Sequence, residues 1–308
     1  MYKILCILLF PACCCTAQES TSFDPFNYDP GAYEKVNLYY ELKGNGDTTL
    51  FFIPGWNLNH TIWQNQVATF APSYRLVLFD MAGCGKSGKN RKHWTLESFA
   101  RDISTVISKE NLTNVILVAH SMGGDIAVDV ALANPGKVIG IIGIDNLKNA
   151  GMTISEENKK GMQPYIKEFI QHYPEMAEER ARSSILSKDS TVIHKIVDSY
   201  RQADPAIAVP TLMNLYPRAA DVKNKLPKLS FVMKFIMCTN TAYDEEALKK
   251  YCRKGYKIVT MDSTGHFPMI ERPAEFNKVL LQLLQSNTVT SLCRRIFYRL
   301  NFILCYIK

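Results

Sequence analysis

The 308-residue chain has few cysteines that could form disulfide bridges or bind a metal within a folded domain. Four of its nine cysteines lie within the first 15 residues. The other five are widely spaced and odd in number: Cys84, Cys238, Cys252, Cys293 and Cys305. This pattern excludes a disulfide-rich scaffold and a zinc site built from paired cysteines. A single bridge in an exported protein stays open, either Cys238 to Cys252 or Cys293 to Cys305.

The sequence also lacks a concentrated basic surface, although its formal net charge is +7. Much of the excess lies in a C-terminal tail without acidic residues, where Arg294, Arg295, Arg299 and Lys308 gather. The body of the chain is therefore close to neutral. This distribution argues against a nucleic-acid partner.

The apolar run at the N-terminus, Ile4 to Phe10, is too short to span a bilayer. Lys3 precedes this run, and the small residues of Cys15-Thr16-Ala17 follow it. The segment predicts a signal peptide over residues 1–17 and an exported protein, either periplasmic or secreted. Because Cys13 and its two neighbours follow the run, a lipid-anchored bacterial protein is the alternative.

The stretch from Val115 to Gly124 predicts a strand, a sharp turn and a helix. Val115 to Ala119 is a continuous apolar run, typical of a strand buried on both faces of a parallel sheet. Apolar residues recur at helical spacing from Ile126 onwards. Between them, Ala119-His120-Ser121-Met122-Gly123 matches the G-x-S-x-G nucleophile elbow except for one added methyl group. This stretch resembles the elbow of the α/β-hydrolase family.

The resemblance covers about residues 33–286 and implies an α/β fold. The expected architecture is a mostly parallel sheet with helices on both faces and an inserted helical cap. Expected strands lie at 36–41, which is an outer antiparallel strand, and at 49–53, 75–80, 115–119, 138–144, 231–238 and 257–261. The hydrolase core then comprises residues 18–145 and 229–286, the cap residues 146–228, and a basic and apolar extension residues 287–308.

The family's catalytic machinery is a triad, and the resemblance implies Ser121 as nucleophile and His266 as base. His266 lies in Gly265-His266-Phe267 after the last expected strand, which matches the family's G-H-F loop. The acid is open between two residues, with a weakened serine–histidine dyad as the remaining alternative. Asp145 ends the strand after the elbow helix, where some members place the acid, although capping or a pair with Lys148 would also explain it. Asp244 follows the next strand, where most members place the acid, but it also opens a helix.

Two backbone N–H groups complete the expected site. Pro54-Gly55-Trp56 follows the strand at 49–53, where the family carries a His-Gly pair. The resemblance implies that the N–H groups of Trp56 and Met122 form an oxyanion hole. No metal or organic cofactor is implied. The glycine-rich Gly83 to Ser87 resembles the family's D-x-R-G-x-G-x-S loop and lacks the spacing of a nucleotide phosphate loop.

These residues predict a serine hydrolase that cleaves a carboxylic ester, or a related small acyl substrate, through an acyl-enzyme. The cap would exclude water and shape the acyl pocket. Candidate pocket residues in the cap are Met152, Met162, Met176 and Met213. The alternative is a ligand-binding protein on the same fold with little or no turnover. The C-terminal tail predicts either a basic amphipathic helix that contacts a membrane or a packed or disordered extension.

Overall fold

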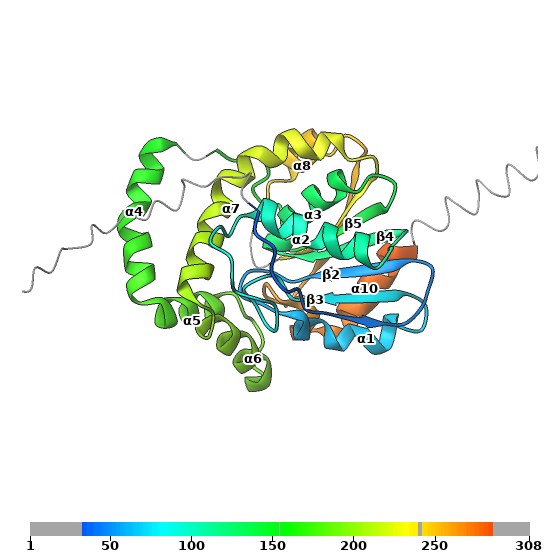
Figure 1. Ribbon diagram of the computed structural model, residues 1–308, viewed down its shortest axis with the longest axis horizontal. Helices are drawn as coiled ribbons and strands as arrows, with labels where there is room; N and C mark the ends of the chain where they lie inside the picture. The colour runs from blue at the N-terminus through cyan, green and yellow to red at the C-terminus, as the bar shows by residue number, and fades with distance from the viewer. Residues whose placement is uncertain (1–32, 154, 240–241, 286–308) are drawn as a thin grey trace, which may run out of the picture.

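The computed structural model describes residues 33–153, 155–239 and 242–285 (Figure 1). The predicted signal peptide and the C-terminal extension lie outside the described residues. Across the described ranges, no helix has the length and apolar character needed to cross a membrane.

A seven-stranded sheet forms the centre of the molecule, in the order β1-β3-β2-β4-β5-β6-β7. All neighbouring strands are parallel except β1, which pairs antiparallel with β3. The prediction of a mostly parallel sheet is confirmed. The strands are β1 (Tyr40–Lys43), β2 (Thr49–Ile53), β3 (Arg75–Phe79), β4 (Val115–His120), β5 (Val138–Ile144), β6 (Met233–Cys238) and β7 (Tyr256–Met261).

The outer strand β1 is displaced from its predicted position at 36–41. Its pairing runs from Tyr40 opposite Phe79 to Lys43 opposite Leu76. Before Tyr40 the partner strand β3 has already ended, so the alternating residues 36–39 have no strand to pair with. The bounds of an edge strand depend on the length of its partner strand as much as on the alternation in its own sequence.

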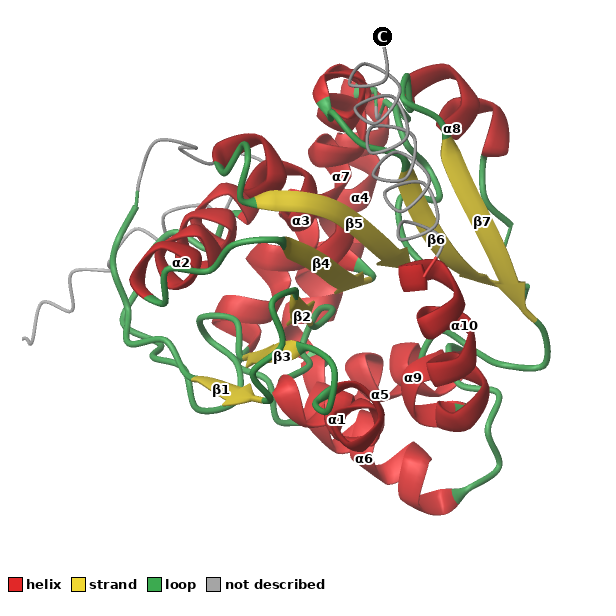
Figure 2. Cartoon of the chain, turned by 90° about the vertical axis from the view of Figure 1, so that its right-hand side faces the viewer, coloured by secondary structure: helices red, strands yellow, loops and turns green. Residues whose placement is uncertain are grey.

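Helices cover both faces of the sheet (Figure 2). One face carries α2 (Leu96–Lys109), α3 (Met122–Ala133) and α8 (Glu245–Tyr251), and the other carries α1 (Gln64–Phe70), α9 (Pro268–Glu271) and α10 (Pro273–Gln285). A 3-10 turn over His60–Trp63 directly precedes α1. The backbone N–H of His60 donates to the buried Asp80, and so does its ring, which holds this turn against the end of β3.

Four helices interrupt the sheet between β5 and β6 and form the cap, on the left of Figure 1. They are α4 (Glu156–Gln171), α5 (Tyr173–Ser183), α6 (Ser190–Arg201) and α7 (Pro205–Lys225), followed by a 3-10 turn at Leu226–Lys228. The last three turns of α7 are held by contacts with the core.

A cluster of charges around one buried arginine makes this contact between cap and core. Arg218 of α7 is 2% exposed and forms ion pairs with Glu97 of α2, Asp129 of α3 and Asp221, whose side chains are 23%, 15% and 45% exposed. Loss of these partners would leave the buried guanidinium uncompensated, which is strongly destabilising. The cluster therefore fixes α7 beside α3, the helix that begins directly after Ser121.

Candidate active site

Ser121 lies in the turn between β4 and α3 with φ 51° and ψ −126°, a conformation that L-residues rarely adopt. Small neighbours make this turn feasible. A Cβ atom on Gly55 would lie 3.1 Å from the Ser121 Cβ, and one on Gly123 would lie 2.8 Å from the carbonyl oxygen of Pro54. The strained turn presents the serine hydroxyl at the carboxyl edge of the sheet, as expected for a nucleophile elbow.

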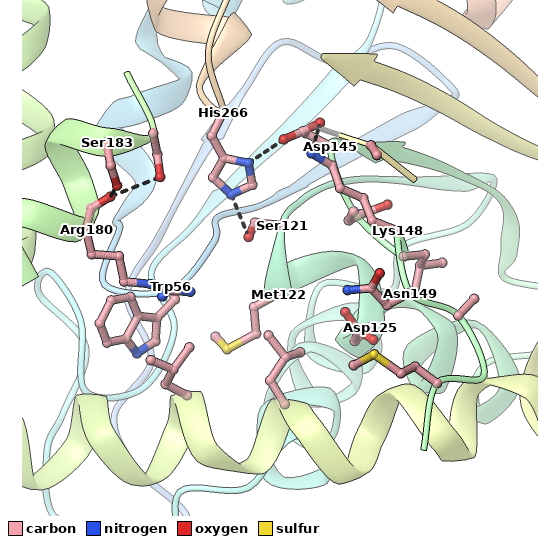
Figure 3. A pocket seen from close by; sticks show the side chains of 18 of the residues that line it. Trp56, Ser121, Met122, Asp125, Asp145, Lys148, Asn149, Arg180, Ser183 and His266 are labelled. Atoms are coloured by element: carbon pink, nitrogen blue, oxygen red, sulfur yellow. Dashed lines mark hydrogen bonds and ion pairs between the residues drawn. The ribbon is translucent and has the colours of Figure 1, made fainter. Parts of the chain in front are cut away.

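Three predicted side chains form one hydrogen-bonded chain (Figure 3). The Oγ of Ser121 lies 2.9 Å from Nε2 of His266, and Nδ1 of His266 lies 2.5 Å from Oδ2 of Asp145. They come from the loops after β4, β7 and β5, at the carboxyl edge of the sheet. This is the geometry in which a carboxylate orients an imidazole and the imidazole takes a serine proton.

The carboxylate of Asp145 is held on both oxygens. Besides the His266 contact, Oδ1 accepts from the N–H of Cys238 at 3.0 Å and pairs with Nζ of Lys148 at 2.8 Å. Burial would raise the pKa of Asp145. The hydrogen bond and charge of His266, together with Lys148, outweigh burial and lower this pKa to about 2. Asp145 is therefore ionised at neutral pH, and its pair with Lys148 accompanies the His266 contact instead of replacing it.

The alternative acid, Asp244, is not brought to His266. Its side chain accepts from the N–H of Ala247 at 2.9 Å and caps α8. Its own N–H donates to the carbonyl oxygen of Lys148. The capping explanation given by the sequence therefore accounts for this aspartate.

The N–H groups of Trp56 and Met122 both lie at the site. Met122 is the first residue of α3, so its N–H has no acceptor within the helix. Neither N–H donates a hydrogen bond within the described part of the chain. Trp56 and Met122 also line the same cavity as Ser121 (Figure 3). No acceptor in the described chain thus occupies the two N–H groups that the predicted oxyanion hole requires.

His120, the residue before the serine, has a role that the sequence did not reveal. Its ring is buried, and Nε2 lies 2.7 Å from the carbonyl oxygen of His266. Burial, and then the charge of His266, lower the pKa of His120 to about 3. The ring is therefore neutral and can donate from Nε2, which holds the backbone of His266 against the elbow.

Glu271 is a second residue that the sequence did not assign to the site. Its carboxylate accepts hydrogen bonds from four backbone N–H groups, those of Gly265 and Phe267 on either side of His266 and those of Leu186 and Ser187 in the cap. The N–H of His266 in turn donates to the carbonyl oxygen of Ser184 at 2.8 Å. The loop between α5 and α6 and the loop that carries His266 are thus joined through one carboxylate.

Replacing Glu271 with glutamine should lower kcat by about 10²-fold, the scale expected when a catalytic group is misplaced by about an ångström. One acceptor oxygen becomes an NH₂ group facing backbone donors, so the histidine loop must shift. Ester hydrolysis at saturating substrate measures the effect. Glu275→Gln is the matched control, because Glu275 pairs only with exposed Arg272 at the start of α10. Full activity in Glu271→Gln would show that the loop is positioned without this carboxylate.

A cavity of about 470 Å³ opens beside the three side chains. Apolar and polar side chains from core and cap line it, including Trp56, Met122, Asp125, Leu147, Asn149, Met152, Arg180, Tyr200, Leu212 and Leu215. Of the four methionines predicted for the pocket, only Met152 lines it. Met213 is fully buried, and Met162 and Met176 pack against the core.

Asp125 lies in this cavity, one helical turn after the nucleophile (Figure 3). Burial raises its pKa to about 7, although the charge of Arg218 opposes the shift. The folded protein therefore binds this proton more tightly than the unfolded chain does. The free energy of unfolding therefore falls as pH rises from about 4 to about 7, because the buried carboxylate must then become charged.

Asp125→Asn should remove this pH-dependent cost. The unfolding free energy of the variant, measured relative to that of the unmodified protein, should be higher at about pH 8 than at about pH 5. The expected increase is about 2–4 kcal/mol. Urea unfolding at both pH values measures it. Asp47→Asn, in the exposed turn before β2, should leave the pH dependence as it is. If the unfolding free energies of Asp125→Asn and the unmodified protein changed with pH in parallel, the raised pKa assigned to Asp125 would be wrong.

The thiols of the described chain are free, and they do not compete with the serine. Cys238 and Cys252 are both unbridged, so the bridge considered between them is wrong. The alternative, Cys293 to Cys305, lies outside the described residues. Burial raises the pKa of Cys252 to about 11 and that of Cys84 to about 12. Because the thiolate is the reactive form, these cysteines are poor nucleophiles.

Comparisons with known proteins identify the family and the fold. The sequence model of the alpha/beta hydrolase family matches residues 50–279. A pimeloyl-[acyl-carrier protein] methyl ester esterase from Yersinia pseudotuberculosis is 23% identical over 265 residues, covering 81% of this chain and 98% of that protein. Two solved structures, each 20% identical, share the fold. The first is a bromoperoxidase from Bacillus anthracis, with a TM-score of 0.71 over 81% of this chain and 96% of that one. The second is a thermophilic esterase from Thermogutta terrifontis, with a TM-score of 0.69 over 82% and 94%. Since the family model spans well over half of the sequence, the chain belongs to the alpha/beta hydrolase family.

Proposed function

We propose that this protein is a serine hydrolase that cleaves a carboxylic ester through an acyl-enzyme. The hydrogen-bonded chain from Ser121 through His266 to Asp145 is the observation that carries the proposal. The esterases among its relatives support the same reaction class.

In the first step, Nε2 of His266 takes the Ser121 proton as Oγ attacks the ester carbonyl. The negative charge moves to the carbonyl oxygen, where the N–H groups of Trp56 and Met122 receive it. His266 then gives its proton to the departing alkoxide, and the alcohol leaves. Asp145 stays ionised and stabilises the imidazolium throughout.

In the second step, water replaces the alcohol. His266 takes a proton from a water molecule, the resulting hydroxide attacks the acyl-enzyme carbonyl, and the same oxyanion donors hold the charge. The proton returns from His266 to Ser121 Oγ as the carboxylic acid leaves. The cap helices α5 and α6 border the cavity and would limit access of bulk water.

A short-to-long series of p-nitrophenyl esters, together with a fluorophosphonate probe, tests the proposal. We expect hydrolysis of at least part of the series and covalent labelling of the protein. Chain-length preference would then describe the cavity. A protein that hydrolyses none of the esters and resists the probe would instead favour the ligand-binding alternative.

Export through the signal peptide and membrane contact through the C-terminal tail stay predictions, since both segments lie outside the described residues. Detection of the mature chain outside the cytoplasm, with its N-terminus at Gln18, would support export.

A further inference from the structure

Arg180 projects from α5 into the cavity and ends over the ring of Trp56 (Figure 3). The central carbon of its guanidinium lies 5.8 Å from the centroid of that ring. Arg180 is exposed, as are Arg182 and Arg201, but those two arginines both pair with Glu178, at 2.7 Å and 3.1 Å. Within the described ranges, no carboxylate lies within ion-pair distance of Arg180. A guanidinium is thus directed into the candidate substrate site without an acidic partner.

A second donor from the cap lies beside it. Tyr200 of α6 lines the same cavity and meets the Trp56 ring edge-on, with centroids 5.2 Å apart. Burial raises the pKa of Tyr200 to about 12, although the charge of Arg180 opposes the shift. Its phenol is therefore neutral at ordinary pH and can donate. In the part of the chain that the structure describes, this hydroxyl has no hydrogen-bond partner.

The other charges at the cavity do not neutralise Arg180. Lys148 and His266 surround the carboxylate of Asp145. Asp125 also lines the cavity, and in the view of Figure 3 it lies on the other side of Met122 from Arg180. The wall formed by Arg180, Tyr200 and Trp56 is therefore positive. A cation over an aromatic face gains some stabilisation, but charge-assisted hydrogen bonds from its N–H groups to an anionic oxygen stabilise it much more.

We propose that the ester substrate carries a carboxylate, bound by the guanidinium of Arg180 with the hydroxyl of Tyr200 as a further donor. The planar guanidinium matches the two oxygens of a carboxylate, and the tyrosine adds one hydrogen bond at the same wall. Because Trp56 also supplies an oxyanion donor, the bound carboxylate lies on the same side of the cavity as the scissile carbonyl. The substrate class is then a half ester of a small dicarboxylic acid. This inference rests on the proposed ester hydrolysis and specifies its substrate.

Monomethyl glutarate and monomethyl adipate test the inference against methyl hexanoate, an ester of similar length without the charge. The rate of acid release in a pH-stat gives kcat and KM. We expect Arg180→Met to lower kcat/KM for the half esters by about tenfold or more, chiefly through KM, and to lower it for methyl hexanoate by much less. Arg180→Lys should recover part of the loss, and Tyr200→Phe should weaken the half esters to a smaller extent.

Arg182→Met is the matched control. It removes an arginine two residues away whose partner, Glu178, lies on the cap surface, so it should leave both classes of ester unchanged. An equal loss for charged and uncharged esters in Arg180→Met would overturn the inference, and so would an unaltered preference. Either result would leave the proposed ester hydrolysis standing.

A binding measurement on a variant that cannot turn over substrate tests carboxylate recognition by Arg180 separately from ester hydrolysis. Calorimetric titration of monomethyl glutarate into Ser121→Ala should show binding that is lost when Arg180→Met is added. No binding to Ser121→Ala would overturn the carboxylate inference alone. Arg180-dependent binding to a protein that hydrolyses no ester would retain the inference and overturn the proposed catalysis.

Discussion

Replacing Ser121 with alanine is expected to lower kcat for ester hydrolysis by about 10⁶-fold, the scale seen when a triad serine is removed. Within the described chain, Ser121 is the hydroxyl that meets a histidine nitrogen at 2.9 Å. The cysteines cannot substitute for it, because burial keeps their thiols protonated. KM should change little, since the cavity that binds the substrate is intact. Initial rates on the best p-nitrophenyl ester measure the effect.

Ser108→Ala serves as the control for this substitution, because Ser108 is exposed on α2, away from the cavity. It should retain the activity of the unmodified protein. If Ser121→Ala kept a substantial fraction of its turnover, the nucleophile would have to be another group, and the acyl-enzyme mechanism proposed for Ser121 would be wrong.

Asp145→Asn is expected to lower kcat by about 10⁴-fold. An asparagine amide can donate to Nδ1 of His266 where the carboxylate only accepts, which favours the wrong imidazole tautomer and removes the charge that stabilises the imidazolium. Because the pKa of Asp145 is about 2, its protonation should not limit activity at mildly acidic pH. Measurement of kcat across the pH range checks both statements.

Asp244→Asn is the decisive comparison, since Asp244 was the other candidate acid. Asparagine caps helices as well as aspartate does, so α8 should keep its stability and kcat should not change. Lys148→Met separates the two contacts of Asp145, because it removes the ion pair and leaves the His266 hydrogen bond. The reverse pattern, with Asp244→Asn inactive and Asp145→Asn active, would exchange the roles of the two aspartates.

The elbow and the histidine loop were predictable because their signals are local. A buried apolar strand, small residues around a serine and a following helix are contiguous in sequence, as is the G-H-F loop after β7. For the same reason β2 and β5 have the bounds expected from their apolar runs, 49–53 and 138–144. For the buried strands β4 and β6 the local pattern gave the strand but missed its bounds by one or two residues, since they begin at Val115 and Met233 and end at His120 and Cys238.

The choice of acid was not local. Asp145 follows β5 directly, and the loop after β7 carries His266 back across β6 to it, where the N–H of Cys238 also holds its carboxylate. Asp244 follows β6, the strand next to β7, but it lies six residues beyond the end of that strand and caps α8. The roles of His120 and Glu271 depend likewise on contacts between segments far apart in the chain, such as Glu271 with Leu186. The sequence contains these residues, but it carries no periodicity or motif that indicates their partners.

The central claim is that an acyl group is transferred to Ser121, and mass spectrometry of the intact protein during turnover tests it most directly. Rapid mixing with a p-nitrophenyl ester and quenching in acid should trap a chain heavier by one acyl group. Digestion should place that group on the peptide containing Ser121, and a burst of p-nitrophenol should accompany its formation. Ser121→Ala should show neither adduct nor burst. Steady hydrolysis with the acyl group on another residue would contradict the account.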